Sequence, residues 1–150
     1  MKLKILEKYK FSRESLVASP ESRVRRRARL FQQKIRQLQF QFLALARLGN
    51  RVLLVDLDLT RPSIASWLGI TDAGPGITAA LRLANTRRLD IDELMRLCAE
   101  LKFGGSKLEV LTGLSNPNRW REVTSDGIEL LESEVEGHFD FIVIDLNDEI

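Results

Sequence analysis

The sequence predicts an α/β fold built on a mostly parallel sheet. Short apolar runs alternate along the chain with helical patterns, and this order is typical of βαβ units with right-handed crossovers. The apolar runs are Arg51–Asp56, Leu108–Thr112 and Phe139–Asp145, and the helical patterns are Ile77–Asn85, Ile91–Leu101 and Gly127–Glu136. With 150 residues, of which 44% are hydrophobic and 29% charged, the chain is long enough to bury a core.

A long amphipathic helix is expected ahead of the first strand, over Glu21 to Leu48. Apolar residues recur there at alternating steps of four and three, which places them on one helical stripe. The stripe consists of Val24, Ala28, Phe31, Ile35, Leu38, Phe42 and Leu45, and the other face carries Arg25, Arg26, Arg29 and Arg36. Gly49 and Asn50 end the pattern, as glycine often does. We therefore divide the chain into a poorly defined segment, 1–20, and one domain, 21–150.

Charge is distributed unevenly along the chain. Up to Arg51 there are fourteen Lys and Arg against three Asp and Glu, whereas the remainder has nine against eighteen. A basic segment of this kind is typical either of a solvated helix face or of a surface that contacts DNA or an anionic membrane. We expect a cytoplasmic protein, with the membrane or the nucleoid as a peripheral location, because no secretory signal and no membrane-spanning stretch is evident.

Two of the predicted strands end in aspartate. Asp56 closes the first strand and is followed by Leu57, Asp58, Leu59, Thr60 and Arg61, and Asp145 closes the last one. The carboxyl ends of parallel strands line the crevice where α/β proteins bind ligands. Carboxylates there suit a hydrated Mg²⁺, although an aspartate after a strand is equally typical of a turn or a helix N-cap. Spacing alone leaves both interpretations open.

Several stretches of the chain together carry a family pattern. Residues 45–63 contain Val-Leu-Leu-Val-Asp-Leu-Asp-Leu-Thr-Arg-Pro-Ser, and the pattern continues in 67–70 and 74–81. It extends to Leu-Glu-Val-Leu-Thr-Gly-Leu at 108–114, to 118–120 and to the strand that ends at Asp145. Over about residues 42–145 the chain thus resembles the ParA/MinD group of deviant Walker P-loop ATPases. MinD/CpaE-like pilus-assembly ATPases are the most similar branch, and residues 45–63 also resemble the Walker A′ region of bacterial tyrosine kinases.

The resemblance implies a P-loop NTPase-like, three-layer fold and a site for Mg²⁺ and ATP. By this comparison Asp56 and Asp58 match the acidic pair that contacts Mg²⁺, with Asp58 positioning the attacking group. Asp145 matches the Walker B aspartate, which reaches Mg²⁺ through water, and Arg61 lies near the phosphates. The implied reaction is ATP hydrolysis, usually in a homodimer that acts in chromosome partitioning, division-site placement or pilus assembly.

The phosphate loop of that family is not found. A glycine-rich loop ending in Gly-Lys-Thr is expected just before the long helix, but the chain has no glycine ahead of Gly49. Residues with a Cβ cannot form the same close backbone cradle around a phosphate. The sequence also ends at Ile150, soon after the presumed Walker B strand. We therefore expect an ATPase with impaired ATP binding, or a truncated or frame-disrupted one, and leave open whether the chain is an enzyme.

Other interpretations remain open. A tyrosine-kinase-like domain fits Arg61 and Pro62, although Tyr9 is the only tyrosine. A non-catalytic module that docks a partner ATPase, DNA or a membrane through its basic helix fits the charge. The glycines at 104 and 105 precede a strand and predict a turn, His138 a surface turn, and Cys98 a buried small residue. Trp67 and Trp120 are expected to be packing anchors.

Overall fold

The structure is a computed structural model that describes residues 42–146 of the chain. The predicted helix over 21–48 enters this range only at its end, where residues 42–47 are helical. The rest of that helix and the domain division at residue 20 lie outside the described residues. No helix among the described residues is both long enough and apolar enough to cross a bilayer.

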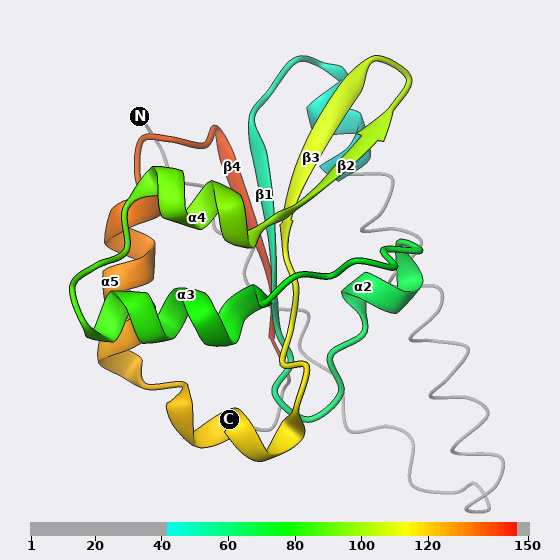
Figure 1. Cartoon of the computed structure of the whole chain (residues 1–150). Helices are drawn as coiled ribbons and strands as arrows, with labels where there is room; N and C mark the ends of the chain where they lie inside the picture. The colour runs from blue at the N-terminus through cyan, green and yellow to red at the C-terminus, as the bar shows by residue number, and fades with distance from the viewer. Residues whose placement is uncertain (1–41, 147–150) are drawn as a thin grey trace, which may run out of the picture.

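One sheet of four strands organises the fold, in the order β2-β3-β1-β4 (Figure 1). Strand β1 (Val52–Leu57) lies between β3 (Ser106–Leu111) and β4 (Phe141–Leu146) and is parallel to both. Strand β2 (Ala99–Phe103) pairs antiparallel with β3. The mostly parallel α/β sheet is confirmed, and β1, β3 and β4 match the three predicted strands to within two residues at each end.

The prediction of a helix from Ile91 to Leu101 was wrong at its end. Helix α4 (Ile91–Leu97) ends with Cys98 in an extended conformation, and the chain continues directly into β2. Leu101 therefore lies on a strand. The apolar residues at 94, 97 and 101 fit a helical period, but a short edge strand also tolerates them. The two glycines at 104 and 105 form the turn to β3, as predicted.

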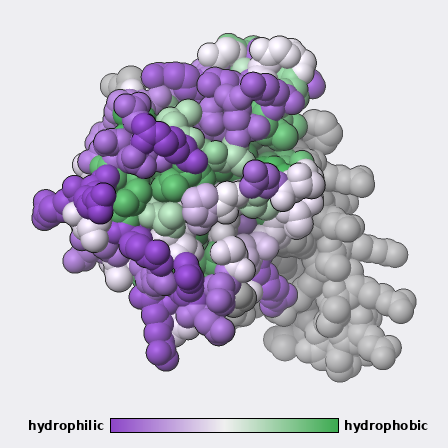
Figure 2. Space-filling model, in the orientation of Figure 1, coloured by the Kyte–Doolittle hydropathy of each residue, from purple (hydrophilic) through white to green (hydrophobic). Residues whose placement is uncertain are grey.

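Three helices cover one face of the sheet. They are α3 (Gly76–Asn85), α4 and α5 (Ser125–Val135), and their apolar sides pack against alternate residues of β1, β3 and β4. Leu53, Ile77 and Leu111 in this layer are fully buried. Figure 2 shows hydrophobic residues in the seam between these helices and hydrophilic residues around it. Residues Asp90 and Thr124 cap α4 and α5 through their side chains.

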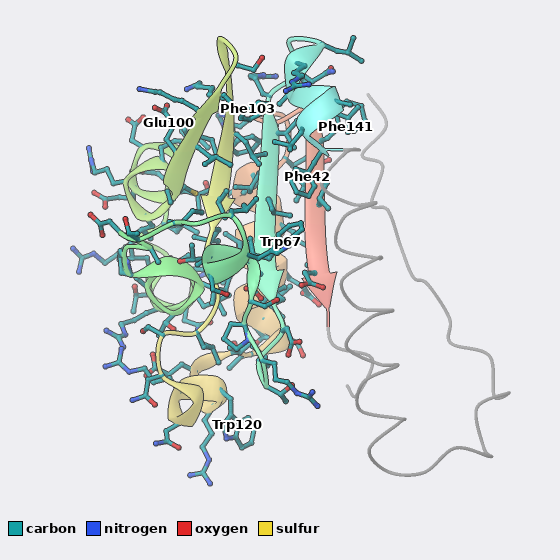
Figure 3. All side chains as sticks on the ribbon, turned by 90° about the vertical axis from the view of Figure 1, so that its right-hand side faces the viewer. Phe42, Trp67, Glu100, Phe103, Trp120 and Phe141 are labelled. Carbon is teal, nitrogen blue, oxygen red and sulfur yellow. The ribbon has the colours of Figure 1, made fainter. Side chains whose placement is uncertain are left out.

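The opposite face carries two short helical segments, residues 42–47 and α2 (Ile64–Trp67). Phe42, with 2% of its surface exposed, packs in a second apolar cluster with Val52, Leu54 and Ile64. Its ring meets that of Trp67 edge-on, with the ring centroids 6.3 Å apart (Figure 3). Helices therefore lie on both sides of the sheet, in three layers.

The predictions for four isolated residues had different outcomes. Trp67 is a packing residue, as expected, and His138 is exposed in the turn after α5. Cys98 is partly buried, and burial raises the pKa of its thiol to about 12, which fits an unreactive side chain. The expectation that Trp120 anchors the core was wrong. It is 54% exposed on the 3-10 helix η1 (Pro117–Glu122), because this short segment lies beyond the end of β3.

Candidate functional site: the acidic edge

The candidate site lies where β1 and β4 end. Asp56 and Asp145 are direct partners in the parallel register of these strands. Partners in register point to the same face of a sheet, which here is the face that holds Phe42 and α2. The sequence prediction that Asp56 and Asp145 meet at one edge of the sheet is therefore confirmed for their backbone positions. We call Asp56, Asp58 and Asp145 the acidic edge.

Asp56 organises the loop that follows β1. Its Oδ2 accepts hydrogen bonds from the backbone N–H groups of Ser63 and Ile64, both at 3.0 Å, and its Oδ1 accepts one from Asp58 N–H at 3.2 Å. Only 1% of the residue is exposed. Burial raises the pKa of its carboxyl, the three backbone donors oppose that rise, and the nearby Asp58 carboxylate adds to it. The side chain thus fixes the start of α2 relative to the end of β1.

Asp58 closes the next turn of the same loop. Its Oδ1 accepts bonds from Thr60 N–H at 3.0 Å, from the Thr60 hydroxyl at 2.9 Å and from Arg61 N–H at 2.9 Å. This is the side-chain-to-backbone pattern of an Asx turn. The loop interpretation of Asp58 is therefore also correct, whereas its predicted role in catalysis stays a prediction. The Arg61 side chain is exposed at the edge of this loop.

Asp145 differs from the other two carboxylates because no hydrogen bond from the described residues reaches its side chain. Burial raises its pKa to about 6, and the charges of Asp56 and Asp58 push it in the same direction. A bound cation would offset the repulsion among these neighbouring carboxylates. Within residues 42–146, however, no group of three or more His, Cys, Asp or Glu side chains is placed to hold a metal ion by itself.

Gly113 completes the edge and was not singled out from the sequence. A Cβ on this residue would come within 2.4 Å of Pro62 Cβ and 2.8 Å of Asp56 Cγ. Gly113 therefore allows the end of β3 to approach both the aspartate and the loop. The signals in the sequence are its place in the stretch 108–114, which carries part of the family resemblance, and its position two residues after β3 ends. The neighbouring Thr112 has its hydroxyl bonded to Ala73 O at 2.7 Å, and its carbonyl accepts from Ile77 N–H at 2.8 Å.

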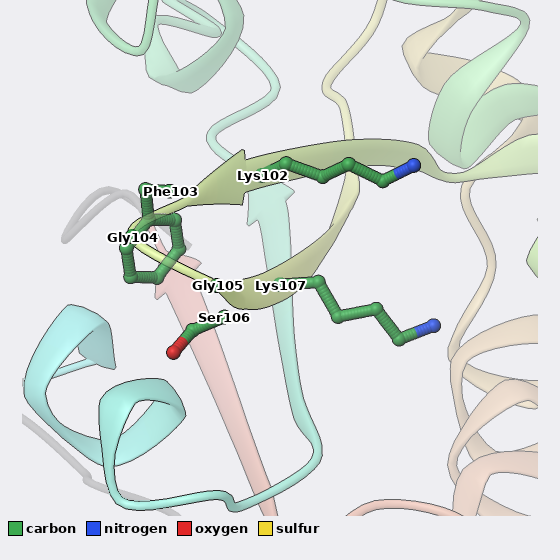
Figure 4. Close-up of a pocket in the computed structure, with 6 residues that line it drawn as sticks. All are labelled: Lys102, Phe103, Gly104, Gly105, Ser106 and Lys107. Atoms are coloured by element: carbon green, nitrogen blue, oxygen red, sulfur yellow. The ribbon is translucent and has the colours of Figure 1, made fainter.

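A hollow of about 440 Å³ lies at the opposite end of β3, around the turn of the β2–β3 hairpin (Figure 4). It is lined by Lys102, Phe103, Gly104, Gly105, Ser106 and Lys107. Both lysines are engaged, since Lys102 and Lys107 pair with Glu100 at 2.8 and 3.3 Å. The hollow is remote from the acidic edge, and its glycines form a hairpin turn instead of a phosphate loop.

No protein-family model and no curated protein matches the chain. Solved structures do match the chain. One is the septum site-determining protein MinD of Pyrococcus horikoshii, complexed with Mg-ADP, with a TM-score of 0.56 at 22% identity. That match covers 71% of this chain and 40% of the MinD chain. A ParA family ATPase of Chlorobium tepidum has a TM-score of 0.56 at 15% identity over 65% of this chain and 38% of that protein.

The cell division ATPase MinD of Pyrococcus furiosus is a third similar structure, with a TM-score of 0.53 at 25% identity. The match covers 71% of this chain and 41% of that protein. The chain therefore spans about two fifths of the length of the structures that it matches.

Proposed function

We propose a function from the fold of this chain, which is that of the ParA/MinD-type deviant Walker P-loop ATPases, as the sequence resemblance predicted. The proposal is that the acidic edge binds Mg²⁺ together with the phosphates of a nucleotide such as ATP, in a domain whose hydrolysis is impaired. The observation that carries it is the register pairing of Asp56 with Asp145 at the carboxyl ends of two neighbouring parallel strands.

The three carboxylates have different roles in this proposal. Asp56 is saturated by backbone donors and acts as a positioning residue, because it sets the loop that carries Asp58. No hydrogen bond from residues 42–146 reaches Asp145 or the Oδ2 of Asp58, so these oxygens would face a cation. Mg²⁺ commonly takes one or two carboxylates and fills its remaining positions with water and phosphate oxygens. A bound Mg²⁺ would neutralise phosphate charge, and the exposed Arg61 would add a positive charge beside it.

Impaired hydrolysis follows from the missing phosphate loop. The family cradles the β- and γ-phosphates with backbone N–H groups and a lysine, and that cradle supplies much of the positioning on which phosphoryl transfer depends. No glycine precedes Gly49 in this chain. We therefore expect weak nucleotide binding that depends on Mg²⁺, and slow turnover or none.

Thermal melts of the full chain test this proposal. Mg²⁺, ATP and both together are added to the unchanged protein and to Asp145→Asn and Asp58→Asn. Stabilisation of about 2–3 kcal/mol is expected at a ligand concentration near one hundred times Kd, and both variants should lose most of it. Asp140→Asn is the matched control, since Asp140 precedes the same strand at its other end. An equal Mg²⁺ response in Asp145→Asn and in Asp140→Asn would contradict the proposal.

The same experiment separates the alternatives. A docking module for DNA, an anionic membrane or a partner ATPase should melt at the same temperature with and without Mg-ATP. Its binding to DNA should fall steeply with salt. A tyrosine-kinase-like domain should bind Mg-ATP and also transfer phosphate to tyrosine. Homodimerisation, which the family resemblance implies, is checked by the dependence of the melting temperature on protein concentration.

A further inference from the structure

Strand β2 lies at the margin of the sheet, as Figure 1 shows. It pairs with β3 on one side, and no strand of residues 42–146 pairs with its other side. From Ala99 to Phe103 it runs in unbroken register with β3, without a bulge or a proline. Natural proteins use bulges and prolines to keep a further strand away from such an edge, so β2 retains an edge that accepts another strand.

The hairpin turn determines which backbone groups of β2 point outward. Its two glycines have φ values of 52° and 82°, as a two-residue type I′ turn requires. The residues that flank such a turn, Phe103 and Ser106, exchange backbone hydrogen bonds, and every second pair along the hairpin does the same. The N–H and C=O groups of Glu100 and Lys102, which belong to the intervening pairs, therefore point to the free side.

We propose that a second copy of this chain pairs antiparallel with the free edge of β2, around a two-fold axis that passes beside Leu101. In this register Glu100 of one copy lies opposite Lys102 of the other, and the reverse pair forms on the other side of the axis. Both residues of each pair have outward-pointing backbone groups, so each pair exchanges its N–H···O=C bonds.

Other registers are disfavoured by the backbone or by charge. A slip of the second copy by one residue sets an outward-pointing residue against one that points to β3, and their hydrogen bonds cannot form. An axis at Glu100 or at Lys102 places two identical charges directly opposite each other, which destabilises an antiparallel pair. The sequence Ala-Glu-Leu-Lys-Phe of β2 is therefore complementary to itself when two copies run in opposite directions about Leu101.

The side chains on the two faces of β2 fit the same register. On one face, the Glu100 and Lys102 side chains are 37% and 78% exposed and form an ion pair at 2.8 Å within one copy, so both are accessible to the opposite charge of a second copy. On the other face, Ala99, Leu101 and Phe103 are half-buried at the margin of the second apolar cluster. The axis places the large Phe103 of each copy opposite the small Ala99 of the other, and pairing removes apolar surface from water.

The interface is small, so we expect a weak dimer. A five-residue strand buries less than the about 1,200 Å² at the lower end of stable protein interfaces, and a Kd of about 100 µM is expected. Strand β3 separates β2 from β1, so this surface is distinct from the acidic edge. The pairing therefore needs no nucleotide and does not depend on the proposed function.

Sedimentation equilibrium of the full chain without nucleotide, at low and high micromolar concentrations, tests the proposal. The unchanged chain should form dimers as its concentration rises. Glu100→Lys and Lys102→Glu each place like charges opposite each other in a dimer of identical chains, so each should raise Kd about tenfold. An equimolar mixture of the two variants should dimerise about as tightly as the unchanged chain, because every pair across the axis then joins opposite charges again.

Glu129→Lys is the matched control, since Glu129 is exposed on α5 and its reversal changes the net charge by the same amount as Glu100→Lys. Its Kd should equal that of the unchanged chain. A chain that stays monomeric at high concentration, or that dimerises only with Mg-ATP, would overturn the proposal. A Kd that ignores Glu100→Lys, or a mixture that fails to restore the dimer, would also overturn it and would assign dimerisation to another surface.

A cross-link gives an independent readout of the axis. In the proposed register the two Leu101 residues form a pair without backbone hydrogen bonds, with Cα atoms about 4.5 Å apart, which suits a disulfide. In a Cys98→Ala background, Leu101→Cys should therefore give covalent dimers under mild oxidation. Ser133→Cys, at an exposed position on α5, is the control and should give few. Equal yields from the two variants would contradict an axis at Leu101.

Discussion

The two ends of the β1–β4 pair surround a carboxylate with opposite charges. At the amino end, Asp140 accepts bonds from Arg51: the backbone N–H at 2.8 Å and the guanidinium Nη2 at 3.2 Å. Hydrogen bonds from Arg51 keep the pKa of that carboxyl below its usual range. At the carboxyl end, Asp145 has acidic neighbours, and its pKa rises to about 6. The first end is built for stability, whereas the second is electrostatically incomplete, as ligand sites often are.

Among these substitutions, Gly113→Ala should cause the largest loss of stability, because the added methyl group lies directly against the acidic edge. The added methyl group would meet Pro62 and Asp56 at distances that no real contact shows, so the β1–α2 loop must move. We expect a loss of about 3 kcal/mol in the free energy of unfolding, measured by urea denaturation.

Gly127→Ala is the matched control for that substitution. Its new Cβ would approach Asn85 Oδ1 at 2.8 Å and Thr124 Oγ1 at 3.0 Å. Both atoms are ends of side chains, so a small shift relieves the contact at the cost of weakening the 3.2 Å hydrogen bond between them. Alanine also has a higher helix propensity than glycine, and residue 127 lies in the first turn of α5. The net change should stay within about 1 kcal/mol, and a loss equal to that of Gly113→Ala would contradict the account of the edge.

Asp56→Ala should have the next largest effect. It leaves the N–H groups of Ser63, Ile64 and Asp58 without their acceptor, and Ser63 and Ile64 lie at the start of α2. Relief from burying the carboxylate offsets part of this loss, so about 2 kcal/mol is expected by urea denaturation. Asp56→Asn keeps one acceptor oxygen and should lose less. Equal losses in the two variants would show that the loop does not depend on these bonds.

Asp145→Asn should raise stability, but only above a certain pH. The folded-state pKa of Asp145 is above its unfolded value, so the native aspartate costs the fold nothing below about pH 4 and destabilises it increasingly as pH rises through about 6. Removing the charge should therefore add about 1–2 kcal/mol at pH 8, after allowance for partial exposure, and nothing at pH 4. Thermal melts at both values check this, and a gain that is independent of pH would contradict it.

Asp140→Asn should have the smallest effect and the opposite sign. The lowered pKa means that its contribution is present at neutral pH and is lost as pH falls below about 4. Because Asp140 and Arg51 are both exposed, the fall in Tm at pH 7 should be small, and salt should reduce it. A gain in stability at pH 7 would contradict the claim that Asp140 stabilises its end of the β1–β4 pair.

Much of the sheet was predictable because strands that are buried on both faces have short, continuous apolar sequences. Strand β2 was not, because Ala99–Phe103 alternates half-buried and exposed residues at the edge of the sheet and follows a leucine pattern that also fits a helix. A hairpin interpretation of Gly104 and Gly105 contains the missing information: a two-residue turn before a strand implies an antiparallel strand ahead of it.

The acidic edge was predictable only in part. Aspartates at the ends of parallel strands must share an edge, so the pairing of Asp56 with Asp145 follows from topology. The approach of Gly113 to Pro62 and Asp56 does not, because it depends on how two loops pack after the strands have paired. Trp120 illustrates the same limit, since an apolar residue in a loop carries no periodicity that tells which way it faces.

The pKa of Asp145, followed by NMR in the full chain with and without Mg²⁺, tests the central claim most directly. We predict a value near 6 without Mg²⁺ and a clear decrease when Mg²⁺ is added, while Asp140 titrates at the same low pH in both conditions. An Asp145 carboxyl that titrates near 4 and ignores Mg²⁺ would contradict the claim that the carboxyl ends of β1 and β4 form a cation site.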